Sequence, residues 1–392
     1  MPSHANYQGV VITAPVSLPY TRYSEHDAPW FIGSVLREML RASGLKKKDI
    51  DGLAVASFSL APDSVLSLTR YFDMSARWLE QLPFGGAAGV LALRRAARAV
   101  QAGDANIVAC IGGDTNRPDG FREPGENTSS SSVDASHPCG AEGPNTAFSL
   151  ITQRYMEEHG ATHEDFGRLC ISQRYNAQHY PNALFGNKPL DMASYLGARA
   201  VAGPLHLYDC VMPCAGGEGF LMMSEERARR LDLPYARVLA AEELHNAFAP
   251  DPVQLRAGWE SFATRLYNAA GIAPAEIDVL QTCDDCPVIA MLQMEGLGFC
   301  QRGEAPRFVR ETPLTFDGDE LAHNTCGGQL SAGQAGSAAG FMGVVEALRQ
   351  VTGTAHGNQV PGACHALASG YGMINFDRGL CSAALVIEGD EA

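Results

Sequence analysis

Hydrophobic positions follow two patterns along the chain, one at helical spacing and the other in short continuous runs. Residues 30–41 and 87–101 place apolar side chains on one face at helical spacing and polar side chains on the other. Residues 53–58 and 107–111 are short apolar runs of the kind that form buried strands. Strands that alternate with helices in this way predict a layered α/β protein.

The sequence also contains a weak internal repeat. Residues 42–53 align without a gap on residues 269–280, and both segments pass from a helical stretch through a glycine into an apolar strand. The glycine-rich segments 85–89 and 333–336 form a second pair, because each opens a long helical pattern. A duplicated α/β unit brings two helix N-termini into corresponding places, and their free N–H groups and positive dipole ends suit anionic intermediates.

The duplication predicts two similar halves, residues 1–234 and 235–392, that share one core. A length of 392 residues with 46% hydrophobic side chains is sufficient for such a core. Within the first half, a long loop excursion is expected over about 114–208. Its opening part, 114–143, is rich in Gly, Pro and Ser, which indicates a surface segment and a candidate substrate lid.

The charge and hydropathy of the chain argue against nucleic acids and membranes as its partners. A formal net charge of −15 argues against a nucleic-acid surface or an anionic membrane as the main partner. No run is apolar enough for long enough to span a bilayer. The first residues, Met-Pro-Ser-His-Ala-Asn, lack the basic and apolar segments of a secretory signal. We therefore expect a cytoplasmic protein with no nucleic-acid partner and no membrane insertion.

The eleven cysteines are scattered, and most lie in apolar surroundings. This usage predicts reduced thiols that are mostly buried. The pairs Cys210/Cys214 and Cys283/Cys286 leave a structural zinc site as an alternative. Because the first pair is loosely spaced and each pair follows an apolar run, we expect no bound metal.

Several short motifs occur in a characteristic order. The strongest is Asn324-Thr-Cys-Gly-Gly328 followed by Gly333-Gln-Ala-Gly336, and the supporting segments are 176–183, 204–209, 216–219 and 297–300. Over nearly the whole chain this order resembles the thiolase superfamily, especially its sterol-carrier-protein-type thiolases and thiolase-like steroid side-chain aldolases. The resemblance implies a five-layered αβαβα sandwich of two similar halves with a long loop excursion.

The catalytic positions of thiolases do not carry over intact. The resemblance places the nucleophilic cysteine of thiolases at Gly86, their loop histidine at Gln334 and their second cysteine near Ser369. Glycine cannot form an acyl-enzyme, and a glutamine amide donates a hydrogen bond but is no base near neutral pH. The aldolase branch instead uses tyrosines, where this chain has Cys283 and Gln334. Tyr371 is a nearby phenol that is a candidate substitute.

Other residues of these loops are candidates for chemistry. Asp284 and Asp285 follow an apolar strand, so either is a candidate general base or hydrogen-bond anchor, with helix capping and solvated charge as the simpler interpretation. Cys283 is a candidate alternative nucleophile or a structural thiol. The family uses the Asn324 position to hold a catalytic water or an oxyanion. The expected substrate-contacting residues are Gly86, Cys326, Gly328, Gly333, Gly336 and Ser369.

The resemblance predicts an enzyme that makes or breaks a carbon–carbon bond next to a CoA thioester. Retro-aldol cleavage of a β-hydroxyacyl-CoA is the leading hypothesis, because this reaction needs no acyl-enzyme. A β-ketoacyl-CoA thiolase or acyltransferase with a displaced nucleophile, and a non-catalytic acyl-CoA-binding subunit, remain as alternatives. The resemblance also implies a homodimer and a small accessory subunit with an OB-fold and a zinc ribbon. Coenzyme A is expected as part of the substrate, and no permanently bound cofactor is expected.

Overall fold

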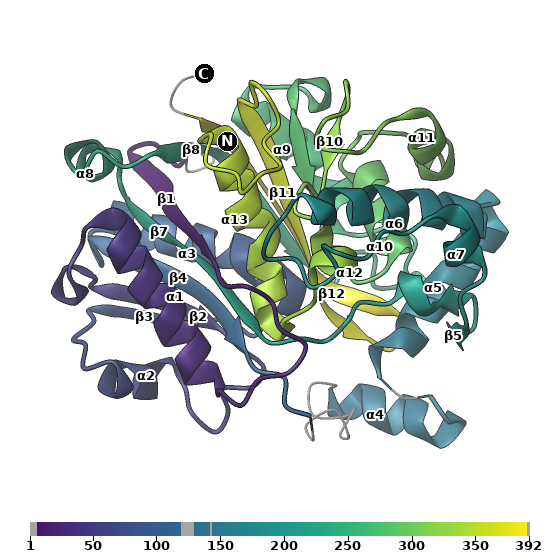
Figure 1. The fold of residues 1–392 in the computed structure, drawn as a ribbon, viewed down its shortest axis with the longest axis horizontal. Coiled ribbons are helices and arrows are strands. Elements are labelled where there is room, and N and C mark those ends of the chain that lie inside the picture. The colour runs from purple at the N-terminus through teal and green to yellow at the C-terminus, as the bar shows by residue number, and fades with distance from the viewer. Residues whose placement is uncertain (1–5, 119–128, 142, 390–392) are drawn as a thin grey trace.

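The computed structural model describes residues 6–118, 129–141 and 143–389 (Figure 1). Each half contributes five strands to one hydrogen-bonded sheet. The first half provides β1 (Val10–Ser17), β2 (Gly52–Ala56), β3 (Trp78–Gln81), β4 (Ile107–Asp114) and β7 (Gly216–Ser224). The second half provides β8 (Tyr235–His245), β9 (Val279–Gln281), β10 (Ala322–His323), β11 (His365–Asn375) and β12 (Arg378–Gly389).

The strand order is β3-β2-β4-β7-β1-β8-β12-β11-β9-β10, so the two halves repeat each other about the β1–β8 contact. That contact is short and antiparallel, and it pairs Val11 with Arg237, Ile12 with Ala236 and Thr13 with Tyr235. In each half the strand that follows the first helix runs parallel to its neighbours, as in β2 beside β4 and β9 beside β11. The order of elements therefore repeats along the chain.

The helices form layers on both sides of this sheet. α3 (Ala88–Ala102) and α13 (Ala339–Val351) share one apolar core with strand residues from both halves. α1 (Ala28–Ser43) covers the outer face of the first half, and α9 (Gly258–Ala270) with α10 (Pro287–Gly296) covers that of the second. Two outer helical layers, two sheet halves and a central helical layer make the predicted five-layered sandwich, which is confirmed.

The repeated turn has a local physical cause. α1 and α9 end at Gly44 and Gly271, whose φ angles of 68° and 77° lie in the left-handed region. Glycine adopts this conformation without the steric penalty of a Cβ atom, so it ends both helices and releases the chain toward the next strand. The aligned glycines of the internal repeat are therefore equivalent C-caps.

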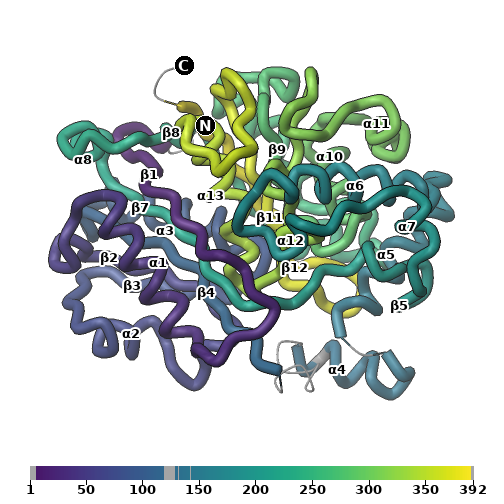
Figure 2. The backbone as a smooth tube through the Cα atoms, viewed as in Figure 1, coloured from purple at the N-terminus to yellow at the C-terminus, as the bar shows by residue number. Residues whose placement is uncertain are grey.

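The chain between β4 and β7 forms the predicted excursion. Its elements are α4 (Ser130–Ser136), α5 (Pro144–His159), α6 (His163–Gln178), α7 (Met192–Leu196), β5 (Ala200–Ala202) and β6 (Leu205–His206). Figure 2 shows this teal segment crossing from the first half to lie over the green second half. Its helices α5 and α6 join the outer core of the second half. Part of the glycine-, proline- and serine-rich stretch, residues 119–128 and 142, lies outside the described residues.

The remaining helices are short. They are α2 (Val65–Tyr71), α8 (Glu225–Arg230), α11 (Ala305–Glu311) and α12 (Gly328–Ala332). Single 3-10 turns, Gly85–Ala87 and Gly336–Ala338, lead into α3 and α13, as the two glycine-rich segments predicted. None of the described helices combines the length and apolar character needed to cross a membrane.

Candidate active site

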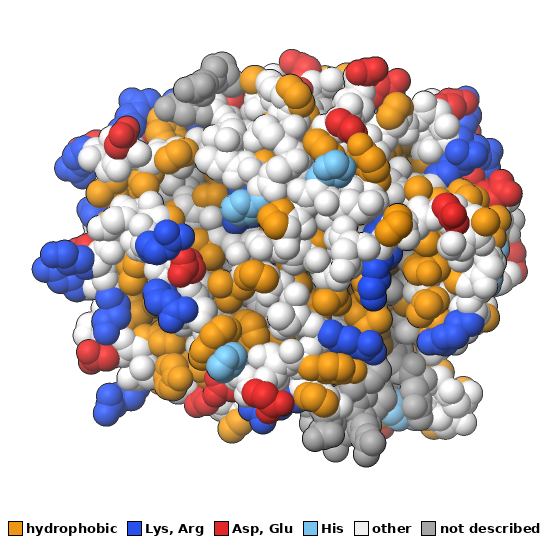
Figure 3. All heavy atoms as spheres, viewed as in Figure 1, with side chains coloured by type: hydrophobic (Ala, Val, Ile, Leu, Met, Phe, Trp, Pro, Cys, Tyr) orange, Lys and Arg blue, Asp and Glu red, His pale blue; other side chains and the backbone are white. Residues whose placement is uncertain are grey.

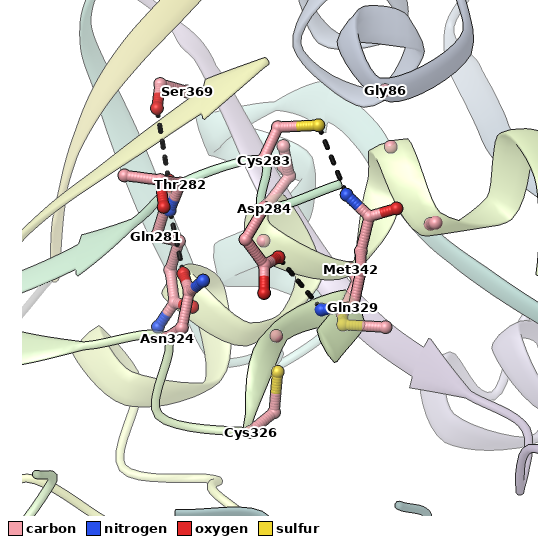
Figure 4. Close-up of a pocket in the computed structure, with 15 residues that line it drawn as sticks. Gly86, Gln281, Thr282, Cys283, Asp284, Asn324, Cys326, Gln329, Met342 and Ser369 are labelled. Carbon is pink, nitrogen blue, oxygen red and sulfur yellow. Dashed lines mark hydrogen bonds between the residues drawn. The ribbon is translucent and has the colours of Figure 1, made fainter. Parts of the chain in front are cut away.

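A small cavity lies where the loops of both halves meet the N-terminal ends of the central helices (Figure 4). Gly86 comes from the turn before α3 and Thr282–Asp284 from the loop after β9. Asn324 comes from the loop before α12, and Gln329 from the first turn of that helix. Gln281, Cys326, Gly328, Met342 and Ser369 also line it. Its volume is about 10 Å³, which is the space of one water molecule.

Gly86 and Cys283 lie directly against each other at this cavity. A Cβ atom on Gly86 would stand 2.4 Å from the Cys283 Sγ and 2.4 Å from the backbone oxygen of Tyr371. No side chain fits at residue 86 in this packing. The thiol of the second half therefore occupies the space beside the N-terminus of α3 where the resemblance places the nucleophile of thiolases.

Asp284 acts as a cap for α12. Its Oδ1 accepts from the backbone N–H of Gln329 at 2.8 Å, and its Oδ2 accepts from that of Leu330 at 3.2 Å. Burial raises the pKa of this carboxyl group to about 7, although the two N–H groups act in the opposite direction. Asp284 lines the cavity, and both of its oxygens cap α12, as the simpler interpretation expects, but its carboxyl group is buried and not solvated.

Asn324 presents an unused donor. Its Oδ1 accepts from the backbone N–H of Thr282 at 2.8 Å, whereas its buried Nδ2 has no hydrogen-bond partner. The residue has a φ angle of 43°, in the left-handed region that asparagine tolerates better than most residues. Because Asn324 lines the cavity and Nδ2 is unpartnered, this N–H group is available to a ligand oxygen.

Cys283 connects Asp285 with the cavity. Its Sγ lies 3.5 Å from the Asp285 Oδ2, and the Gln329 Nε2 donates to the same sulfur at 3.2 Å. Burial, followed by the charge of Asp285, raises the pKa of the thiol well above its usual value. Burial also raises the pKa of half-buried Asp285 to about 6. The thiol is therefore protonated near neutral pH, and it meets a carboxylate that is largely ionised.

Ser369 and Tyr371 differ in their relation to the cavity. Ser369 lines it, and its hydroxyl donates to the Gln293 Oε1 at 2.6 Å. The side chain of Tyr371 instead stacks on Trp259, and its hydroxyl donates to the Gln254 Oε1 at 2.7 Å. Only the backbone oxygen of Tyr371 approaches the site, through Cys283, so its phenol is not brought to the cavity.

The second glycine segment lies beyond the cavity lining. The backbone of Gln334 bonds to Met212 and Cys214, and Gly333 packs against the Cys214 sulfur. A Cβ atom on Gly336 would meet the carboxylate of Asp114 at 2.4 Å. These residues shape the turn before α13, whereas Cys326 and Gly328 do line the cavity.

Sequence reasoning did not single out Gln329, which the structure places at the centre of the site. It is 2% exposed, its Oε1 has no partner, and it immediately follows the diglycine of the strongest motif. That position, a polar residue where the helix begins, was the available signal. Within the described parts of the chain, no group of three or more His, Cys, Asp or Glu side chains is arranged to hold a metal ion.

Comparisons with known proteins agree with this architecture. The family model "Thiolase C-terminal domain-like" matches residues 240–381. A steroid side-chain-cleaving aldolase of Thermomonospora curvata is 31% identical over 330 residues, which are 80% of this chain and 82% of the relative. A 17-hydroxy-3-oxo-4-pregnene-20-carboxyl-CoA lyase of Mycobacterium tuberculosis is 29% identical over 351 residues, 85% of this chain and 88% of the relative.

A solved structure described as an Ltp2-ChsH2(DUF35) aldolase superposes with a TM-score of 0.82 at 26% identity, covering 97% of this chain and 98% of that chain. These comparisons place the chain among proteins with the thiolase fold. The chain belongs to the thiolase superfamily, in the branch that contains these acyl-CoA aldolases.

Proposed function

We propose that this protein is an enzyme that cleaves a β-hydroxyacyl-CoA by a retro-aldol reaction. The observation that carries the proposal is the packing of Gly86 against Cys283 and Tyr371, which leaves no room for a nucleophilic side chain at the thiolase position. A retro-aldol reaction needs a base and an oxyanion site, and it proceeds without an acyl-enzyme. The relatives that are named as an aldolase and a lyase support the same reaction class.

In this reaction a base removes the proton of the β-hydroxyl group, and the Cα–Cβ bond breaks. The β-carbon becomes a ketone or aldehyde carbonyl, and the electron pair of the broken bond forms the thioester enolate. A proton then returns to Cα, which releases the shortened acyl-CoA. Atoms and charge balance with no oxidant, metal or second substrate.

The site supplies stabilisation for the enolate. The unpartnered Nδ2 of Asn324 donates to the thioester oxygen as negative charge develops on it. Gly86 lies in the turn that leads into α3, so the positive end of that helix faces the same region. A buried donor with no other partner is worth more in the transition state than one that is already bonded to water.

The substrate class follows from the relatives, whose names describe a steroid side chain and a 17-hydroxy-20-carboxyl-CoA. We therefore infer a CoA thioester whose hydroxyl-bearing β-carbon belongs to a bulky group such as a steroid ring. Coenzyme A enters as part of this substrate and leaves with the product. The name of the neighbouring aldolase structure includes a DUF35 partner, which supports a small accessory subunit here, and a homodimer is proposed from the family resemblance.

A second candidate is a non-catalytic subunit that binds acyl-CoA. The specific observation in its favour is the cavity volume of about 10 Å³, which admits one water-sized group unless side chains such as Met342 move. An acyltransferase that uses Cys283 as a displaced nucleophile is less well supported, because burial and the adjacent carboxylate raise the pKa of its thiol.

Intact-protein mass spectrometry separates these functions. The protein is incubated with a β-hydroxyacyl-CoA and, separately, with acetyl-CoA, while the released carbonyl compound and acyl-CoA are quantified. We expect one molecule of carbonyl compound for each molecule of shortened acyl-CoA released, and no increase in the mass of the protein from a bound acyl group. An increment mapped to Cys283 supports the acyltransferase and refutes the proposal. Acyl-CoA binding with neither product nor increment, in the presence of a DUF35-type accessory protein, identifies the non-catalytic subunit.

A further inference from the structure

Retro-aldol cleavage requires a proton acceptor, and the side chains around Cys283 are arranged as a relay. The thiol has one proton and two lone pairs. It lies 3.5 Å from the Asp285 Oδ2, while the Gln329 Nε2 donates to the sulfur at 3.2 Å. The sulfur also faces Gly86, which has no side chain to shield it from the cavity. One lone pair of the sulfur is therefore left for a group that enters the cavity.

We propose that Cys283 and Asp285 form the proton-accepting pair of the reaction and that Gln329 is a positioning residue for the thiol. This inference rests on the proposed function and identifies its base. Asp285 does not line the cavity, whereas Cys283 does, so a substrate proton reaches the carboxylate through the sulfur. The β-hydroxyl proton moves to Sγ as the thiol proton moves to Asp285. After the Cα–Cβ bond breaks, the thiol gives one proton to Cα and takes back the proton held by Asp285, which restores the starting state of the pair.

The electrostatics of the site fit a relay better than a nucleophile. Asp284 and Tyr371 are the other titratable groups that face Cys283, from its own loop and from β11. Asp284 is occupied in capping α12, and Tyr371 presents its backbone oxygen, 3.5 Å from the sulfur. Two neighbouring carboxylates disfavour a stable thiolate, but a relay never places a full charge on the sulfur.

Gln329 has a distinct part in this geometry. Asp285 and the oxygen of Tyr371 are both acceptors, so the thiol proton points to one of them and the sulfur accepts from the amide. The amide donor fixes the direction of the S–H bond and supports electron density on sulfur during transfer. Gln329 is itself held at the first turn of α12 by the bond from its backbone N–H to Asp284.

The relay is tested with Asp285→Asn, Cys283→Ala, Cys283→Ser and Gln329→Leu, with Ser331→Ala on the same helix as the matched control. Ser331 bonds to Arg174 and lies outside the cavity lining. We expect Asp285→Asn and Cys283→Ala to lower kcat by about 10²- to 10⁴-fold, the usual contribution of general-base catalysis. Cys283→Ser should retain more activity than Cys283→Ala, because a hydroxyl also donates and accepts one proton.

Two readouts distinguish catalysis from a merely structural effect. The rate of the wild-type protein should rise with pH as Asp285 ionises, and Asp285→Asn should remove that limb of the profile. The difference Raman spectrum between wild type and Cys283→Ala isolates the S–H stretch of Cys283, and Asp285→Asn and Gln329→Leu should each shift it. Ser331→Ala should change neither readout.

Failure of the proton relay can be distinguished from failure of the proposed function. If the wild-type protein cleaves a β-hydroxyacyl-CoA while both Asp285→Asn and Cys283→Ala stay within twofold of its rate, the relay is refuted and the proposed function stands. If no β-hydroxyacyl-CoA is cleaved, the proposed function fails. In that case an S–H stretch unchanged by Asp285→Asn and Gln329→Leu also refutes the hydrogen-bonded arrangement. Circular dichroism of each variant checks that it folds.

Discussion

Gly86→Ala is the most direct test of the packing on which the proposed function rests. The added Cβ atom would stand 2.4 Å from both the Cys283 sulfur and the Tyr371 backbone oxygen. Both distances are one ångström short of the 3.4 Å at which ordinary van der Waals contact begins. The two contacts differ in how easily they relax, because a thiol can rotate and a strand carbonyl cannot.

The magnitude follows from the rigid contact. Tyr371 lies in β11, which pairs with β12 along its length and with β9 at its start, so its carbonyl moves only with the sheet. Overpacking of a core costs about 1–3 kcal/mol, and the backbone clash places this substitution near the upper end. For a chain of 392 residues, about 3 kcal/mol lowers Tm by roughly 4 °C.

The assay is differential scanning calorimetry or urea unfolding of three variants. Gly86→Ala with Cys283→Ala should recover only part of the loss, because it relieves the sulfur contact and leaves the carbonyl contact. Gly197→Ala is the matched control: its Cβ atom would meet only the Ala193 oxygen, at 3.2 Å, on an exposed turn. A Gly86→Ala protein within about 0.5 kcal/mol of wild type would show that residue 86 has room for a side chain, and the central argument against a nucleophile there would fail.

Three further predictions concern the polar groups of the core. Asn324→Asp keeps the acceptor for Thr282 but replaces the free Nδ2 donor with oxygen, so kcat for β-hydroxyacyl-CoA cleavage should fall about 10²- to 10³-fold, and an unchanged kcat contradicts the oxyanion role. Burial raises the pKa of Glu218 and of Asp284 to about 7, so between about pH 4 and pH 7 these two groups hold protons in the folded protein that the unfolded chain has released, and the stability that they contribute falls as pH rises. Urea midpoints measured at several pH values should fall more steeply with pH for the wild-type protein than for Glu218→Gln, whose side chain does not titrate; equal slopes contradict the assignment. Asp114→Ala removes the carboxylate that accepts from the backbone N–H groups of residues 58, 59 and 337, and should cost about 3 kcal/mol or more in urea unfolding, whereas a loss below 1 kcal/mol means that water replaces it.

Part of this architecture could be predicted from the sequence, because glycines that end or open helices act through their local backbone conformation. The gap-free match of residues 42–53 with 269–280 predicted equivalent helix ends, since both Gly44 and Gly271 adopt a left-handed conformation that glycine favours. The two glycine-rich segments were likewise correctly predicted to open long helices. Glycine at residue 86 by itself argues against an acyl-enzyme at that position, because it has no side chain to carry the acyl group.

Where side chains point was decided by contacts between segments far apart in the chain. The phenol of Tyr371 was predicted to substitute for a catalytic group, yet packing against Trp259 and a bond to Gln254 hold it away from the cavity. Gln329 lies at the cavity because Asp284, 45 residues earlier in the chain, caps the helix that contains Gln329. The sequence determined the repeated fold, and it has a glycine, Gly86, where the family resemblance places the nucleophile of thiolases. Only the tertiary structure decided which polar groups remain unpartnered at the cavity, because burial and hydrogen-bond pairing depend on every segment that packs around them.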